Sequence, residues 1–215
     1  MNIEVNKQSS IRITGSKTLY FDPLEWNYKH DADYIFITHS HFDHFSLLSI
    51  LELKKDSTII ITPKDIVEEL LSIGISEEYI LIVSPNQRFV LKNLEFQTIP
   101  AYNLHKKHHP KEKGWVGYLV SFDQVIYYIA GDSDVTSFAK EVKCDVAFLP
   151  VGGTYTMDCL EAANLCNIIH PKLAIPTHYG YVVGSIKDAE IFKKRLDKGI
   201  QCKILIKDEK KDVQS

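Results

Sequence analysis

Apolar and polar positions fall into short runs along the first part of the chain, and this pattern predicts β-strands. Three such runs, separated by polar or glycine-containing turns, cover residues 3–6, 10–14 and 18–23. Residues 33–39 are mostly apolar, which is typical of a strand buried on both faces. In residues 47–55 the apolar positions recur at helical spacing, so we expect a helix to follow that strand.

The same patterns alternate through the rest of the chain and predict a mixed α/β protein. Further strands are expected at residues 57–63, 79–83, 88–91, 94–100, 115–122, 124–131, 145–153, 173–180 and 201–207. Further helices are expected at residues 64–74, 158–170 and 185–199. The polar end at 208–215 reads as a solvated tail. Because no repeat of fixed period and no linker rich in Pro, Gly or Ser is present, we expect one domain over residues 1–215.

Composition narrows the class of protein. The chain has 215 residues, of which 45% are hydrophobic and 25% are charged, as in a soluble globular domain. A formal net charge of -3 gives no reason to expect binding to nucleic acid or to an anionic membrane. The first residues lack the basic and apolar regions of a secretory signal, and no apolar run is long enough to span a membrane. The four cysteines form no CxxC pair, so we expect free thiols in a reducing cytoplasm.

Four potential metal ligands occur within six residues, directly after the buried strand expected at 33–39. They are His39, His41, Asp43 and His44, in the order HxHxDH. Neutral imidazole and carboxylate together bind divalent ions such as Zn, Mn or Fe. A single histidine at a strand end is usually an ordinary core or surface residue, but four ligating types at this spacing favour a metal site.

Two more candidate ligands follow later strands. Asp132 lies in the segment AGDSD, just past a predicted strand, and His178 lies in PTHYG, at the end of another. Taken alone, they would be read as a turn aspartate and a loop histidine. Because strand ends can meet in one crevice, we expect both residues to join the histidine cluster and complete two adjacent metal sites.

The order of these motifs resembles the metallo-β-lactamase superfamily over nearly the whole chain. HxHxDH after a buried strand, GDSD, and PTH before a glycine carry the resemblance. It implies a four-layer αββα sandwich with a dinuclear metal site at one edge of two mixed sheets. By position, His39 and His41 would bind the first ion, Asp43, His44 and His178 the second, and Asp132 would bridge them. The segments IPAYN, GDSD and LPVGGTYTMD are further similar to small hydrolases around ascorbate-phosphate lactonase.

The chain departs from the superfamily pattern at one position. Most members carry a third histidine for the first ion between HxHxDH and the bridging aspartate, where this sequence has Asn103. An amide oxygen is a weaker zinc ligand than imidazole. Asn103 can therefore bind weakly, or line the site without strong coordination, which we favour. Otherwise one of three nearby histidines completes the site: His105, His108 or His109.

The resemblance also implies a chemistry. Redox members that use iron have a glutamate at the position of His41, so imidazole there favours hydrolysis. Two divalent ions, with zinc expected first and Mn or Fe as alternatives, would lower the pKa of a shared water from ~15.7 toward ~7. The resulting metal-bridging hydroxide would attack a carbonyl or phosphoryl centre, and Asp43 would orient it and shuttle a proton. Asp22, which precedes a proline, is expected either to support a metal ligand from behind or to be a turn residue, and we favour the turn.

The expected substrate is a small anionic ester, lactone or phosphoester. The loop over residues 104–114 contains three histidines and four lysines against one glutamate. It is either a solvated surface loop or a lid that brings positive charge over the metals. Tyr155 is a weaker candidate for substrate contact, and nothing in the sequence indicates the oligomeric state.

Two other functions remain in view. A nuclease or phosphodiesterase of the same fold is disfavoured by the net charge and by the lack of a basic or aromatic-rich extension. A non-catalytic metal-binding module is disfavoured by the complete HxHxDH motif, although Asn103 keeps this reading open. Hydrolysis of β-lactams would require export, for which the sequence shows no signal.

Overall fold

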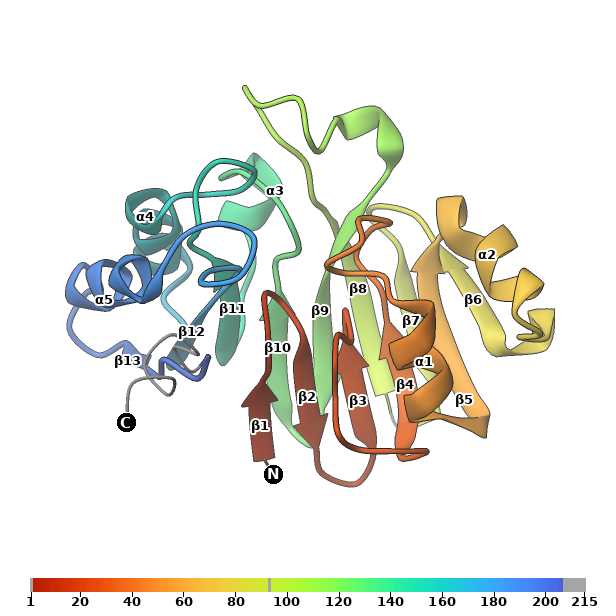
Figure 1. Ribbon diagram of the computed structural model, residues 1–215. Coiled ribbons are helices and arrows are strands. Elements are labelled where there is room, and N and C mark those ends of the chain that lie inside the picture. Colours follow the sequence, from red (N-terminus) through yellow and green to blue (C-terminus); the bar gives the residue numbers. More distant parts are fainter. Residues whose placement is uncertain (1, 93, 207–215) are drawn as a thin grey trace, which may run out of the picture.

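Two mixed β-sheets form the centre of the computed structural model, which describes residues 2–92 and 94–206 (Figure 1). The first sheet contains, in spatial order, β1 (Asn2–Val5), β2 (Ile11–Thr14), β3 (Thr18–Phe21), β4 (Ala32–Phe36), β5 (Lys54–Pro63) and β6 (Ile80–Val83). Its first three strands pair antiparallel, and β3 to β6 run parallel.

The second sheet has seven strands, which lie side by side in the order in which they occur along the chain. In spatial order they are β13 (Gln201–Cys202), β12 (Leu173–Thr177), β11 (Val146–Pro150), β10 (Val125–Ile129), β9 (Val116–Phe122), β8 (Leu94–Pro100) and β7 (Arg88–Leu91). Strands β10 to β13 are parallel, whereas β7 to β10 are antiparallel. Each sheet therefore has one parallel part, whose strands end at a common edge.

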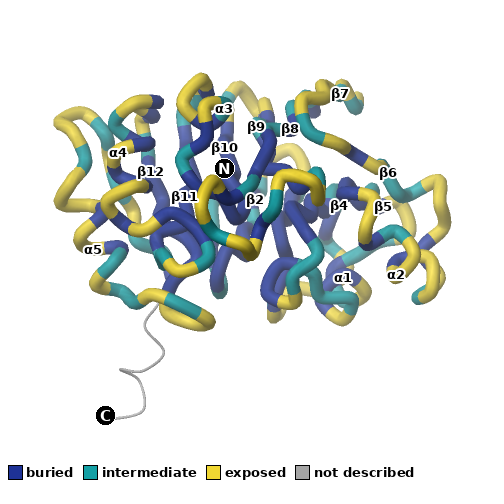
Figure 2. The backbone as a smooth tube through the Cα atoms, turned by 90° about the horizontal axis from the view of Figure 1, so that it is seen from above, coloured by how far each residue is buried: buried dark blue, intermediate teal, exposed yellow. Residues whose placement is uncertain are grey.

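Helices cover the outer faces of the sheets. The helices are α1 (Leu47–Leu53), α2 (Val67–Ser72), α3 (Ser137–Lys140), α4 (Cys159–Ile169) and α5 (Ile186–Lys194). One apolar cluster lies between α1, α2 and the first sheet, and a larger one fills the space between the sheets and under α4 and α5. Figure 2 shows the buried backbone along the central strands and the exposed backbone at the rim. This is the expected four-layer αββα arrangement, which the structure confirms.

Most expected elements are present, with differences at their ends. The helix expected at 64–74 begins as a 3-10 turn at Lys64–Ile66, and the strand expected at 201–207 is formed only by Gln201–Cys202. The short helix α3 was not expected from the sequence. Residues 208–215, expected as a tail, lie outside the described residues, so the prediction of a single domain over 1–215 stays a prediction. None of the helices in the described ranges is long and apolar enough to cross a bilayer.

Tyr118 joins the two sheets next to the first histidine of the HxHxDH motif. Its ring lies in the core beside Phe21 and Phe36 of the first sheet. Its hydroxyl donates a hydrogen bond of 2.6 Å to the carbonyl of Ile37, two residues before His39. Because Tyr118 belongs to β9 and Ile37 follows β4, this bond fixes one sheet against the other at the edge where the motif begins.

We expect Tyr118→Phe to lower the free energy of unfolding by about 1–3 kcal/mol, because a buried carbonyl loses its donor. The measurement is urea unfolding of the variant beside wild type. Tyr34→Phe, in β4, is the control, since the Tyr34 hydroxyl makes no hydrogen bond within the described residues. Equal stability of Tyr118→Phe and wild type would contradict this role.

Candidate metal centre

The HxHxDH motif forms a tight turn between β4 and α1. The amides of His44 and Phe45 donate to the carbonyl of His41, at 2.9 and 2.8 Å. Ser46 then caps α1 by accepting a hydrogen bond from the Ser49 amide. The turn and the cap reverse the chain at the strand end, which places neighbouring side chains of the motif in one crevice.

Three segments distant in sequence meet this turn at the carboxyl edge of the sheets. Asp132 follows β10, His178 follows β12, and His109 lies in the loop between β8 and β9. Figure 1 shows this loop rising above the strand ends. The convergence agrees with the rule that the ends of parallel strands meet at one edge.

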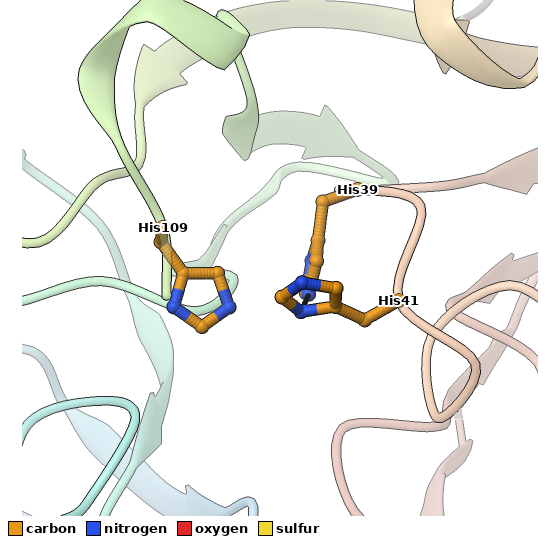
Figure 3. A group of neighbouring side chains, drawn as sticks. All are labelled: His39, His41 and His109. Carbon is orange, nitrogen blue, oxygen red and sulfur yellow. Dashed lines mark hydrogen bonds between the residues drawn. The ribbon is translucent and has the colours of Figure 1, made fainter. Parts of the chain in front are cut away.

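The first group of potential ligands consists of His39, His41 and His109. Their ring nitrogens lie within 4.8 Å of one another. Figure 3 shows the three rings turned toward a common point, with His109 approaching from the opposite side to the other two. Nε2 of His39 lies 3.1 Å from Nδ1 of His41, and the His109 ring is buried. Three imidazoles in this arrangement suit a borderline ion such as zinc.

The second group consists of Asp43, His44 and His178, and Asp132 lies between the two groups. The side-chain ligand atoms of Asp43, His44 and His178 again lie within 4.8 Å of one another. The Asp132 carboxylate lies 3.3 Å from Nε2 of His44 and 3.0 Å from Nε2 of His178. Its Oδ2 is also 3.3 Å from Nε2 of His109 in the first group. Asp132 is therefore placed to serve both groups.

Several buried polar atoms at this centre have no hydrogen-bond partner among the described residues. They are Nε2 of His44, Nε2 of His109 and Oδ1 of Asp132. Buried polar atoms are normally hydrogen-bonded, because an unpaired one loses its interaction with water without compensation. Ligation of divalent cations would satisfy all three atoms at once, so the residues present fit a metal centre.

Asp22 holds His44 in place. This fully buried aspartate accepts hydrogen bonds from the amide and hydroxyl of Thr38, both at 2.7 Å. Its Oδ2 also lies 2.7 Å from Nδ1 of His44, which leaves Nε2 of that ring directed at the centre. The sequence favoured a turn role for Asp22, but its contacts are those of a carboxylate that orients a candidate ligand, His44.

Asn103 contacts His109 through its side chain. Its Oδ1 accepts a hydrogen bond from the His109 amide at 3.0 Å and lies 3.2 Å from Nδ1 of that ring. Its Nδ2 donates to the carbonyl of Tyr155 at 2.9 Å. Of the histidines that the sequence left as alternatives, the structure places the His109 ring in the cluster, and Asn103 is bonded to it. His105 is exposed, and His108 packs against the Tyr155 ring.

The electrostatic state of the side chains also suits cation binding. Burial lowers the pKa of His39 and His41, so both are neutral and free to ligate at pH 7. Burial opposes charge on His44 and His178, but the nearby Asp132 carboxylate raises the pKa of both rings. The same contacts keep the pKa of Asp132 low, in spite of its burial. Protons on His44 and His178 thus balance the buried negative charge of the carboxylates. Divalent cations could replace these protons in that role.

A cavity of about 230 Å³ opens beside the cluster. Beyond the potential ligands, its walls are Phe42, His108, Tyr155 and Val182. A larger cavity of about 470 Å³ lies near Lys17 and Asp33, at the start of β3 and just inside β4, and therefore near the opposite strand ends. Among the described residues, its walls hold no group of potential metal ligands, so we assign the chemistry to the smaller cavity.

One buried contact of the centre had no signal in the sequence. Gln8, in the turn between β1 and β2, donates a hydrogen bond of 2.8 Å from Nε2 to Oδ2 of Asp43. Nothing in the spacing of the motifs indicates that this turn reaches the HxHxDH segment. The structure brings together all six residues expected as ligands, and their role as ligands stays a prediction.

The chain belongs to the family described as the Beta-lactamase superfamily domain, which it matches over residues 3–178. It is 28% identical over 224 residues to a UPF0173 metal-dependent hydrolase of Nanoarchaeum equitans, covering 99% of this chain and 100% of that protein. These findings class the chain with the metal-dependent hydrolases of the metallo-β-lactamase superfamily, as the sequence predicted.

Solved structures show the same fold. A metal-dependent hydrolase from Parabacteroides distasonis superposes with a TM-score of 0.79 at 29% identity, covering 96% of this chain and 92% of the other. Igni18, a metallo hydrolase from Ignicoccus hospitalis, gives a TM-score of 0.78 at 20% identity, covering 95% and 94%. None of these three proteins is named an ascorbate-phosphate lactonase, so the narrower likeness stays a prediction.

We expect Asn103→Leu to weaken metal binding roughly 10–100-fold, as is typical when a histidine loses its orienting partner. The measurement is competition with a chromophoric chelator. Asn167→Leu is the control, because the side chain of Asn167, in α4, also bonds two backbone groups, the carbonyl of Arg195 and the amide of Asp197. An affinity of Asn103→Leu equal to that of the control would refute support of His109 by Asn103.

Proposed function

We propose that the protein is a hydrolase with a dinuclear centre that acts on a small ester, lactone or phosphoester. The observation that carries this proposal is the pair of buried ligand groups around Asp132, with three of their atoms lacking partners. His39, His41 and His109 would hold one cation, and Asp43, His44 and His178 the other. Zinc is the first candidate because imidazole dominates, and the carboxylates also admit Mn or Fe.

Different side chains of the centre would have different roles in the reaction. When bound, the cations would supply Lewis acidity, which makes water a nucleophile at neutral pH and stabilises developing negative charge. Burial opposes ionisation of Asp43, but its contact with His178 and the charge on His44 lower its pKa, so it is ionised at neutral pH. As an acceptor in the cavity wall, Asp43 would orient the attacking water and receive its proton. Tyr155 and Phe42, in the same wall, would contact the substrate.

The proposed preference for an anionic substrate depends on the loop between β8 and β9. Lys106 of this loop is already paired, with its Nζ 2.6 Å from Oδ1 of Asp134. Lys107 is exposed and adjoins His108, which lines the cavity. Charge on Lys107 is therefore the feature that would attract an anion to the cavity.

A reducing cytoplasm is the proposed compartment. None of the four cysteines forms a disulfide within the described residues. The cysteines are Cys144, Cys159, Cys166 and Cys202. Free thiols are typical of reducing compartments, which supports this proposal.

We expect His41→Ala and Asp132→Asn to lose bound metal and to lower kcat by at least about 100-fold, because each removes one ligand of the proposed centre. Metal content is measured by elemental analysis of protein purified without chelators, followed by a screen of esters, lactones and phosphoesters. His105→Ala, an exposed histidine of the same loop as His109, is the matched control. Full activity and metal content in His41→Ala would refute the proposed centre.

We expect Lys107→Glu to raise KM for an anionic phosphoester several-fold more than for a neutral lactone, because it reverses charge beside the cavity. The difference should shrink as ionic strength rises. Lys198→Glu, an exposed lysine between α5 and β13, changes the net charge equally and serves as control. Equal effects on both substrates would contradict attraction of an anion by this loop.

A further inference from the structure

Gln8 occupies an unusual place for a long polar side chain. It lies in the turn between β1 and β2 and has no exposed surface. Its backbone φ of 50° is in the left-handed region, which favours glycine, asparagine and aspartate. A glutamine in such a turn is unfavourable by conformation and by burial, so its retention needs a compensating interaction.

The side chain of Gln8 contacts two members of the second ligand group. Its Nε2 donates to Oδ2 of Asp43 at 2.8 Å and lies 3.2 Å from Nε2 of His178. The backbone carbonyl of Gln8 accepts a hydrogen bond of 2.9 Å from the amide of His178. Its Oε1 is buried and has no hydrogen-bond partner. Both the main chain and the side chain of Gln8 are thus directed at the metal centre.

The turn that carries Gln8 is fixed by its neighbours. Nδ2 of Asn6 donates to the carbonyl of Leu24 at 2.8 Å. The hydroxyl of Ser10 accepts hydrogen bonds from the Leu24 amide and from Nε1 of Trp26, both at 2.8 Å. Since the turn is bound on both sides of Gln8, the amide group is held in one place relative to Asp43.

We propose that Gln8 is a positioning residue, which holds Oδ2 of Asp43 and the His178 backbone so that the second ligand group keeps its geometry. Oδ2 of Asp43 is also 3.5 Å from Nε2 of His178 and 3.7 Å from Nε2 of His44, so the donor from Gln8 fixes the oxygen that faces these two rings. This inference rests on the proposed metal centre, but it does not depend on which substrate the protein hydrolyses.

Two substitutions separate positioning from a general structural role. Gln8→Asn keeps an amide and suits the left-handed backbone, but its side chain is one methylene shorter and cannot reach Asp43. Gln8→Glu keeps the length but places a carboxylate against the Asp43 carboxylate, which repels it. Gln124→Asn is the matched control, because Gln124 is also in a turn, at φ 65°, and is exposed.

The experiment is titration of each metal-free protein with Co²⁺, followed by its absorption spectrum and by chelator competition. We expect Gln8→Asn and Gln8→Glu to bind the weaker of two Co²⁺ ions roughly 10–100-fold less tightly, with an altered spectrum. The thermal midpoint of Gln8→Asn should equal or exceed that of wild type, and Gln124→Asn should match wild type in affinity. With a hydrolysed substrate, kcat should fall in the Gln8 variants while KM changes little.

The possible failures are distinguishable. If wild type binds two ions and Gln8→Asn retains affinity and spectrum, the positioning role is wrong and the proposed centre stands. If Gln8→Glu binds Co²⁺ more tightly than wild type, Gln8 is itself a ligand, which also overturns positioning. If wild type binds no divalent ion, both the proposed function and this inference fail.

Discussion

The structure depends on one electrostatic constraint, which is the burial of Asp132 among imidazole rings of both ligand groups. Its carboxylate lies 3.0–3.3 Å from the Nε2 atoms of His178, His44 and His109. A buried carboxylate is unfavourable unless its charge is balanced. In spite of burial, the carboxylate raises the pKa of His44 and His178, so protons on these two rings balance its charge, and divalent cations could replace them. The four-layer fold brings Asp132 and the imidazole rings together, because the parallel strands of both sheets end at the same edge.

A set of surrounding residues keeps the ligands in place, and each acts on a different segment. Tyr118 ties β9 to the strand end before His39, and Asp22 orients the His44 ring. Asn103 supports His109, and Gln8 reaches Asp43 from the N-terminal turn. These contacts come from both sheets. The centre therefore depends on the packing of the whole sandwich, which explains how a loop as long as that between β8 and β9 can present a ligand at a defined point.

The sequence predicted those parts of the centre that local geometry determines. The HxHxDH motif is one turn, and Asp132 and His178 lie directly after strands, so their convergence follows from the fold. The position of His109 could not be derived, because it depends on how Asn103 folds its loop back. Gln8 could not be found for the same reason, because it depends on a contact between segments that no spacing along the chain records. For Asp22 the sequence left two roles open, and only the contact with His44 distinguishes them.

The most direct test of the account is anomalous X-ray diffraction from crystals of the protein purified without chelators, with data collected across the absorption edge of the metal present. The account predicts two anomalous peaks in each molecule, one beside His39, His41 and His109 and one beside Asp43, His44 and His178, with Asp132 between them. A single peak, or peaks away from Asp132, would contradict it.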